Sequence, residues 1–150
     1  MNIRPAQDKD MPAIGELEKA CLPAGDVWSE ALLSNMFTGS YDKIFVLEDE
    51  STVIGYINTR DIGGDVDLMS ICVAPEYQGR GCGAMLMERI LAEPYDRIIL
   101  EVRESNVKAI GLYEKFGFEK YARRREYYSN PAEDAIIMIR IRSAGAENNV

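Results

Sequence analysis

Three glycines lie close together in the segment Tyr77–Met85, YQGRGCGAM, at Gly79, Gly81 and Gly83. Glycine permits positive φ angles and removes side chains that would keep a ligand away from the main chain. An apolar run at helical spacing follows, so the segment is predicted to turn into the start of a helix. The N–H groups at a helix start, together with the cation of Arg80, suit a phosphate or a pyrophosphate. The alternative is a tight strand-to-helix turn that binds no ligand.

Two known phosphate-binding motifs compete for this segment. The ATP- and GTP-binding loop GxxxxGK[ST] is excluded, because no Lys followed by Ser or Thr comes after the glycines. The dinucleotide-binding motif GxGxxG/A is satisfied by Gly79, Gly81 and Ala84, and Glu101 follows about twenty residues later, where that motif has a ribose-binding carboxylate. Against it, the residues APEYQ separate the first glycine from the apolar strand that ends near Val73. This alternative predicts that the chain binds NAD.

The charge and the residue types of the chain limit its chemistry. A formal net charge of −8 disfavours a surface that tracks nucleic-acid phosphates and suits a basic peptide better, so we expect no nucleic-acid partner. The sequence contains no histidine, so catalysis must use carboxylates, tyrosines, cysteines, lysines or backbone groups, and we expect no metal site. The cysteines, Cys21, Cys72 and Cys82, form no paired framework and are expected to be reduced thiols.

The length and the composition indicate one domain. The chain has 150 residues, of which 47% are hydrophobic, enough for a single core. We expect this domain to span residues 1–143 and residues 144–150 to form a flexible tail. The N-terminal residues lack a signal-peptide pattern, and no apolar run reaches membrane-spanning length, so a cytoplasmic protein without a membrane partner is expected. The oligomeric state stays open.

The hydrophobic periodicities predict an α+β sheet with one strand-helix-strand crossover at its middle. Asp8 is expected to cap a first helix whose apolar side includes Met11 and Ile14. The later segments alternate between the two-residue period of strands and the helical period. Strands are predicted at 2–6, 43–49, 52–62, 65–75, 97–102, 119–128 and 133–141, and helices at 81–94 and 105–118.

The segment Gln78–Gly83 reads [QR]xxGx[GA] and lies between a central strand and a helix. It resembles the loop with which the Gcn5-related N-acetyltransferase (GNAT) superfamily binds the pyrophosphate of acetyl-coenzyme A. The order of elements from residue 3 to about residue 141 is also similar. The resemblance implies the GNAT fold, a mixed, mostly antiparallel sheet flanked by helices, whose crossover carries the pyrophosphate loop. It implies acetyl-coenzyme A as co-substrate, held by Gln78, Gly79, Arg80, Gly81, Cys82, Gly83, Ala84, Asn106 and the main chain of Ile71, Cys72 and Val73.

The C-terminal half narrows the resemblance. The segments LEVRESN (100–106), LYEKFGF (112–118), RRREYY (123–128) and EDAIIM (133–138) resemble the RimI type, the ribosomal-protein N-terminal alanine acetyltransferases. WSE (28–30) is similar to the short N-terminal signature of that group, although the stretch before it is longer. The resemblance implies a peptide α-amine as acceptor, such as the N-terminal alanine of a ribosomal protein. The alternatives are a small amine, a lysine side chain, or a non-catalytic module that binds coenzyme A.

The same resemblance gives Glu101 the role of general base and Tyr113 the role of general acid. Glu101 follows an apolar run, so partial burial would raise its pKa, whereas Arg103 on the same strand would act in the opposite direction. Tyr113 lies two helical turns after Asn106, so both are expected on one side of the helix. The structural alternatives are a paired strand-end carboxylate for Glu101, a core position for Tyr113 and a helix cap for Asn106.

The ordinary pKa values of amines favour an N-terminus over a lysine. A backbone amine has a pKa of about 7.7 to 8.0 and lysine one of about 10.4, so deprotonation at pH 7 costs roughly 1 kcal/mol against about 4 to 5 kcal/mol. A covalent route through Cys72 or Cys82 is the less favoured mechanism, because Cys82 would face the pyrophosphate. Two points stay open: whether Glu101 acts directly or through water, and whether Tyr127 and Tyr128 line an acceptor groove or fill the core.

Overall fold

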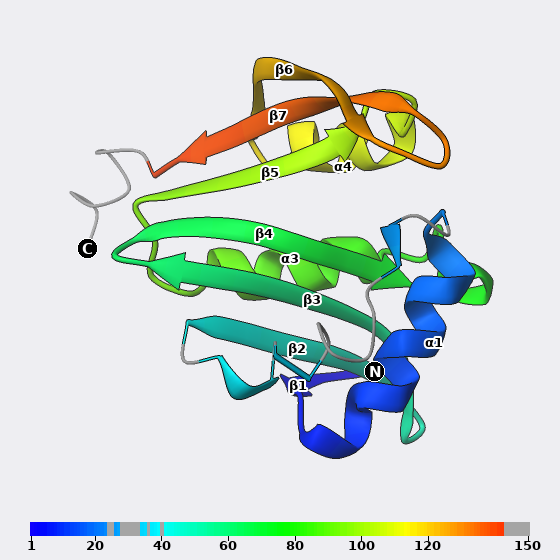
Figure 1. The fold of residues 1–150 in the computed structure, drawn as a ribbon. Coiled ribbons are helices and arrows are strands. Elements are labelled where there is room, and N and C mark those ends of the chain that lie inside the picture. The colour runs from blue at the N-terminus through cyan, green and yellow to red at the C-terminus, as the bar shows by residue number, and fades with distance from the viewer. Residues whose placement is uncertain (24–25, 28–33, 36, 40, 143–150) are drawn as a thin grey trace.

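A seven-stranded sheet organises the described residues, 1–23, 26–27, 34–35, 37–39 and 41–142, of the computed structural model (Figure 1). Neighbouring strands follow the order β1-β2-β3-β4-β5-β7-β6, and every pair is antiparallel except β4 and β5. The strands are β1 (Asn2–Pro5), β2 (Asp42–Asp49), β3 (Thr52–Ile62), β4 (Asp65–Val73), β5 (Arg97–Arg103), β6 (Glu119–Tyr128) and β7 (Glu133–Ile141). The predicted α+β sheet with one parallel crossover is confirmed.

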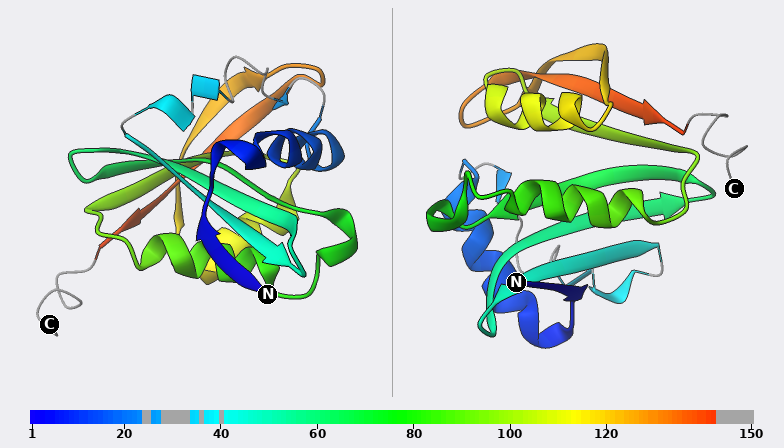
Figure 2. Two further views of the ribbon diagram at one scale, coloured as in Figure 1. Left: turned by 90° about the horizontal axis from the view of Figure 1, so that it is seen from below. Right: turned by 180° about the vertical axis from the view of Figure 1, so that it is seen from behind.

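Helices cover the two faces of this sheet (Figures 1 and 2). One face carries α1 (Met11–Cys21), whose buried Ile14 and Leu17 pack with Tyr56 of β3. The other face carries α3 (Cys82–Leu91) and α4 (Val107–Lys115), whose apolar sides join a larger core. Short 3₁₀ turns, η1 (Asp8–Asp10) and η3 (Pro75–Tyr77), precede α1 and the glycine segment. Among the described residues, no helix combines the length and the apolar character needed to cross a bilayer.

The first helix begins later than the sequence suggested. Asp8 was expected as its cap, but Asp8 opens the 3₁₀ turn and Asp10 is the residue before α1. The Asp10 carboxylate accepts a hydrogen bond from the Gln7 N–H at 2.7 Å and pairs with Arg4 at 2.8 Å. The prediction was wrong because Asp10, rather than Asp8, makes the contacts that close the 3₁₀ turn and bind it to β1. The segment 28–30 and the tail 144–150 lie outside the described residues.

The central strands β4 and β5 pair only over their first residues. Their register runs from Asp65↔Arg97 to Asp67↔Ile99 and then stops. On the other side of β4, the register with β3 shifts by one residue around Met69, which is a β-bulge. A bulge bends the strand that carries it. Beyond Asp67, β4 therefore stays with β3 while β5 stays with β7, and the two strands diverge toward the glycine segment (Figure 1).

Candidate active site

The glycine segment forms a turn that leads directly into α3. Gly79 and Gly81 have φ angles of +79° and +82°, and Gly81 is the residue before the helix. No side chain caps this helix start, and the first internal bond runs from the Met85 N–H to the Gly81 oxygen at 3.1 Å. The N–H groups of the first helical residues therefore lack acceptors within the helix. A helix start of this kind suits an anion, as the sequence predicted for this segment.

Contacts on its N-terminal side hold this turn in place. The Tyr77 hydroxyl donates to Asp49 at the end of β2, at 2.9 Å, and the Gln78 amide donates to the Val73 carbonyl at 3.0 Å. The Arg80 guanidinium lies over the Tyr77 ring, 5.1 Å from its centre. The Gln78 side chain therefore stabilises the turn, and the Arg80 side chain packs on Tyr77.

The edge of β4 that faces away from β3, toward the space between β4 and β5, offers main-chain groups. The Ala74 N–H donates to the Ile54 oxygen of β3 at 2.8 Å. The hydrogen-bonding direction of the main chain alternates along an antiparallel strand. The N–H and C=O groups of Cys72 therefore also point toward β3, whereas those of Ile71 and Val73 point toward the space between β4 and β5. The Val73 carbonyl accepts from the Cys21 thiol at 3.1 Å as well as from Gln78.

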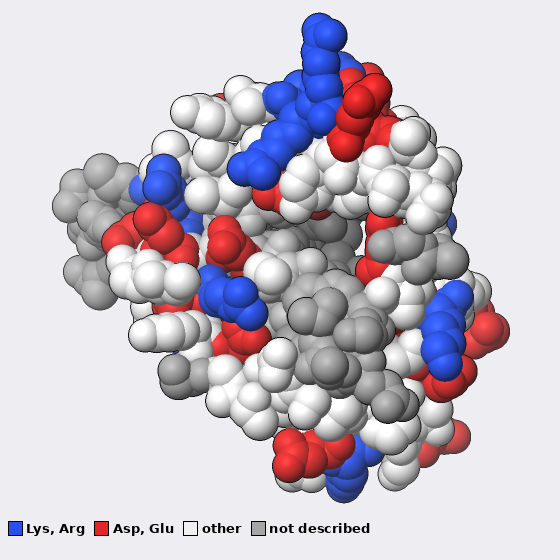
Figure 3. Space-filling model, viewed as in Figure 1, with Lys and Arg blue, Asp and Glu red and all other residues white. Residues whose placement is uncertain are grey.

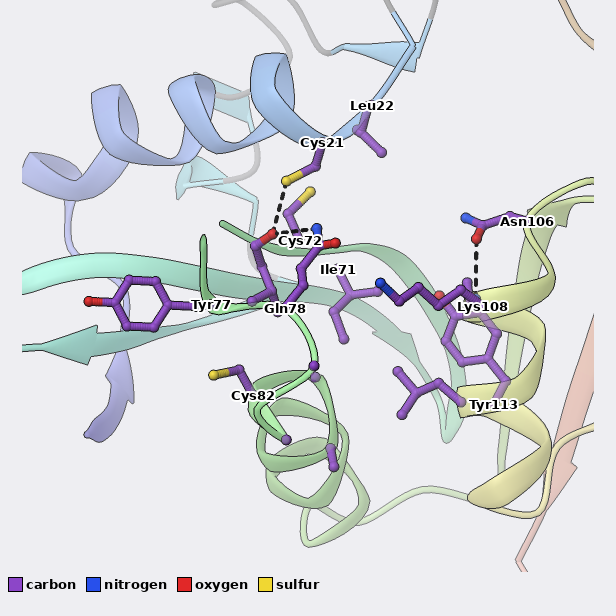
Figure 4. A pocket seen from close by; sticks show the side chains of 17 residues that line it. Cys21, Leu22, Ile71, Cys72, Tyr77, Gln78, Cys82, Asn106, Lys108 and Tyr113 are labelled. Carbon is purple, nitrogen blue, oxygen red and sulfur yellow. Dashed lines mark hydrogen bonds between the residues drawn. The ribbon is translucent and has the colours of Figure 1, made fainter. Parts of the chain in front are cut away.

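A cavity of about 430 Å³, the glycine-loop cavity, lies between this edge, the turn and α4 (Figure 4). Ten of the predicted cofactor residues line it, and Arg80 does not. The ten are Ile71, Cys72, Val73, Gln78, Gly79, Gly81, Cys82, Gly83, Ala84 and Asn106. Sequence reasoning missed Cys21 and Lys108, which also line it. Lys108 sits in the first turn of α4, where its charge had no recognisable motif.

A second cavity, of about 470 Å³, lies between β4, β5 and the end of β6 and is called the Glu101 cavity. The two cavities share Ile71, Asn106 and Tyr113 in their walls. Figure 3 shows the surface hollowed in this region, with acidic side chains on both sides of the hollow. Glu101 lines this second cavity. Because β4 and β5 diverge, adjoining cavities extend from the glycine turn to the predicted base.

Glu101 is partly buried, and none of the described cations forms an ion pair with it. The neighbouring Glu101 carboxylate raises the pKa of the Tyr127 hydroxyl. Arg103, expected to compete for Glu101, binds Asp26 at 2.8 Å and Glu133 at 3.2 Å instead. The structure thus leaves Glu101 at the cavity wall with a phenol as neighbour, which disfavours the paired-carboxylate alternative.

Tyr113 is a wall residue of both cavities. Its side chain is buried, and this burial raises the pKa of its hydroxyl. Its ring also lies 5.9 Å from that of Phe118, so it contributes to the core as well. Among the described residues, its hydroxyl has no hydrogen-bond partner. Asn106 caps α4 by accepting from the Ala109 N–H at 3.1 Å, and lies with Tyr113 on the cavity side of α4 (Figure 4).

The walls of the Glu101 cavity include groups that the sequence analysis missed or left open. Asp67 and Asp26 line it, as do Tyr127 and Tyr128, whose rings meet edge to face at 5.0 Å. Partial burial and the charge of Glu101 raise the pKa of Asp67. Its position two residues after Asp65 on an alternating strand was the only signal in the sequence. The two tyrosines therefore line the Glu101 cavity rather than fill the core.

The two cysteines considered for a covalent route are poorly suited to it. Cys72 is 3% exposed, and a hydrogen bond with Cys21, together with burial, raises the pKa of its thiol far above the usual range. Cys82 is 2% exposed, with its sulfur 3.9 Å from that of Met1. Because the thiolate is the reactive form, direct transfer is favoured over an acetyl-cysteine.

On this mixed sheet, an uncapped helix start lies beside the β4 edge and an adjoining acidic cavity, an arrangement that suits a transferase with an acyl carrier. The model of the acetyltransferase (GNAT) family matches residues 11–118, and the chain belongs to this family. The element order agrees, because β4-α3-β5 carries the glycine turn after an antiparallel half. A dinucleotide-binding fold, the alternative from the glycine spacing, is not supported.

Relatives within the family are similar over nearly the whole chain. The [ribosomal protein bS18]-alanine N-acetyltransferase of Salmonella typhimurium is 34% identical over 138 residues, which cover 86% of this chain and 89% of the relative. The crystal structure of the ribosomal-protein-S18-alanine N-acetyltransferase from Escherichia coli matches with a TM-score of 0.87 and 32% identity, covering 96% of both chains. The N-alpha-acetyltransferase RimI of Mycobacterium tuberculosis is 29% identical over 136 residues, 87% of this chain and 86% of the relative.

Proposed function

We propose that the protein transfers the acetyl group of acetyl-coenzyme A directly to the α-amine of a peptide, the N-terminal alanine of a ribosomal protein. The observation that carries this proposal is the meeting of the two cavities at Tyr113 and Asn106, with the glycine turn in one and Glu101 in the other. The similarity to the bS18-alanine N-acetyltransferases supports the choice of acceptor.

The residues of the glycine-loop cavity fit the carrier. The N–H groups from Gly79 to Ala84 would hold its diphosphate, and Lys108 would add a positive charge at the opposite wall. Ile71 and Val73 present main-chain groups with which the pantetheine arm would pair as an added strand. When bound, the carrier supplies an acetyl group activated as a thioester.

Glu101 would receive the proton of the incoming ammonium group. The carboxylate of Asp26 is neutralised by Arg103, whereas Glu101 and Asp67 are not ion-paired with any described residue. Their negative charge attracts a cationic amine into the cavity. The Tyr127 phenol, which lines the same cavity, would donate to Glu101 and help to fix the orientation of the carboxylate. A base of this kind suits an α-amine, which deprotonates more easily than a lysine.

Tyr113 would supply the proton that the departing thiolate needs. A phenol is protonated at neutral pH, and the hydroxyl of Tyr113 has no competing partner among the described residues. Its position in the wall of both cavities brings it to the border between carrier and acceptor. Tyr113→Phe removes the proton while keeping the ring in the core, so we expect a slower turnover with carrier binding retained.

The test measures coenzyme A release with a panel of short peptides that differ in their first residue. We expect turnover with a free N-terminal alanine and none with the same lysine-containing peptide after acetylation of its N-terminus. Turnover confined to the blocked peptide or to small amines would overturn the α-amine assignment. Thermal stabilisation by coenzyme A without release on any acceptor would identify a binding module, and stabilisation by NAD instead would reject the carrier.

A further inference from the structure

Two thiols from distant parts of the chain meet at the wall of the glycine-loop cavity. Cys21 ends α1, and Cys72 lies in β4 (Figure 4). The two thiols lie close together (Figure 4), and the Cys21 thiol donates a hydrogen bond to the Val73 carbonyl at 3.1 Å. The proposed transfer mechanism uses neither thiol.

The pair is chemically asymmetric. Cys21 is partly exposed at the cavity, whereas Cys72 is buried. The neighbouring Cys72 thiol lowers the pKa of Cys21 to about 7, even though burial and the charge of Glu76 act in the opposite direction, and the pKa of Cys72 is raised. Thiolates, rather than thiols, attack disulfides. Accessibility and pKa therefore both make Cys21 the reactive member.

We propose that Cys21 is a modification site that forms a mixed disulfide with a pantetheine-type thiol, delivered as the disulfide of coenzyme A. The choice of reagent rests on the proposed function, because the cavity that exposes Cys21 is the cavity assigned to the carrier. The carrier ends in a thiol, and its arm is expected along the β4 edge on which Cys21 lies. Binding of the nucleotide part holds the reagent at a high effective concentration beside the thiol.

The exchange is balanced without any further reactant. The Cys21 thiolate attacks one sulfur of the reagent, whose S–S bond breaks while a bond between Cys21 and that sulfur forms. The second coenzyme A leaves as a thiolate and takes up the proton that Cys21 released. The attached half then occupies the glycine-loop cavity and excludes acetyl-coenzyme A. A free thiol reverses the reaction by the same exchange.

The experiment treats the full chain with coenzyme A disulfide and follows intact mass and peptide maps over time. The matched reagent is glutathione disulfide, which lacks the nucleotide. The matched variants are Cys21→Ser, whose hydroxyl keeps a donor for the Val73 carbonyl, and Cys82→Ser, which removes a buried thiol from the same cavity. Thermal unfolding checks that both variants are folded.

We expect one adduct, at Cys21, that forms at least about tenfold faster with coenzyme A disulfide than with glutathione disulfide. It should persist in Cys82→Ser, disappear in Cys21→Ser, slow down with excess acetyl-coenzyme A and be released by dithiothreitol. An adduct on another cysteine, or equal rates with both reagents, would overturn the inference. A chain that acetylates its peptide but is not modified at Cys21 keeps the proposed function and loses only this site.

Discussion

The two cavities meet at Tyr113 but are built from different parts of the chain. Ten of the seventeen residues that line the glycine-loop cavity come from one continuous segment, residues 71–84. The residues that line the Glu101 cavity come from several segments and include Asp26, Asp67, Glu101 and Tyr127. The glycine-loop cavity therefore depends mainly on one turn and the strand before it, whereas the Glu101 cavity depends on how several elements are placed.

Their supports differ in the same way. The glycine turn depends on two positive φ angles and on short contacts such as Tyr77 to Asp49. The Glu101 cavity depends on Arg103, which binds Asp26 and Glu133, donates to two carbonyls and lies 4.4 Å from the centre of the Tyr128 ring. One buried cation therefore connects the segment after α1 with the β6–β7 turn.

Glu101→Gln is the substitution that best separates the roles of the two cavities. This substitution keeps the shape of the wall and removes the proton acceptor, so turnover on an alanine peptide should fall about 10²-fold or more. Carrier affinity, measured by calorimetry, should stay unchanged because Glu101 does not line the glycine-loop cavity. Unchanged turnover, or a loss of carrier affinity as large as the loss of turnover, would contradict the division of roles.

Arg103→Met tests the support of the Glu101 cavity. Its loss leaves two partly buried carboxylates without their cation, so the free energy of unfolding should fall by about 2 to 3 kcal/mol. The KM for the peptide should rise more than that for the carrier. The control is Arg123→Met, because Arg123 forms two ion pairs at the exposed surface. Its effect in urea titrations should be much smaller than that of Arg103→Met, and equal losses for the two variants would refute the assignment.

Gly81→Ala tests the support of the glycine-loop cavity. A Cβ at Gly81 would meet no atom within 4 Å, so only the φ of +82° opposes it. That conformation costs an L-residue about 1 to 2 kcal/mol, and relaxation of the turn should weaken carrier binding about tenfold. The control, Gly111→Ala, lies in α4 with equally open space and should raise stability by about 0.5 to 1 kcal/mol. Unchanged carrier affinity in Gly81→Ala would show that the turn does not hold the diphosphate.

The fold and the glycine-loop cavity were largely predictable because their signals are local. Strand and helix periodicities, the glycine turn and the cap at Asn106 each depend on a few neighbouring residues. The start of α1 was not, because the ion pair between Arg4 and Asp10 joins β1 to the 3₁₀ turn and carries no periodicity. Local patterns thus gave the elements, and a contact between elements decided one boundary.

The Glu101 cavity was predictable only for the residues that a family motif names. Glu101 and Tyr113 came from the resemblance, and the structure brings both to the same wall. Asp67 enters because a β-bulge ends the pairing of β4 with β5 just after it. Cys21 meets Cys72 because α1 packs on β4. Such contacts depend on how the sheet bends, which no short segment encodes.

Asp67→Asn gives the smallest expected effect and tests whether the acidic wall is kept for function. Since the pKa of Asp67 is raised in the folded protein, folding disfavours its charged form. This cost is present at neutral pH and vanishes as the pH falls below the unfolded value of about 3.9, so Asp67→Asn should raise the Tm slightly at pH 7 and less near pH 4. The KM of a cationic peptide should rise about threefold at low salt.

Asp65→Asn is the matched control on the same strand. Asp65 binds Arg97 at 2.8 Å and does not line the cavity, so its substitution should leave the peptide KM unchanged and should not raise the Tm. If Asp67→Asn behaves like Asp65→Asn in both measurements, Asp67 is an ordinary surface carboxylate. If it stabilises the fold while weakening peptide binding, the Glu101 cavity holds two neighbouring negative charges at a cost in stability, because the acceptor arrives as a cation.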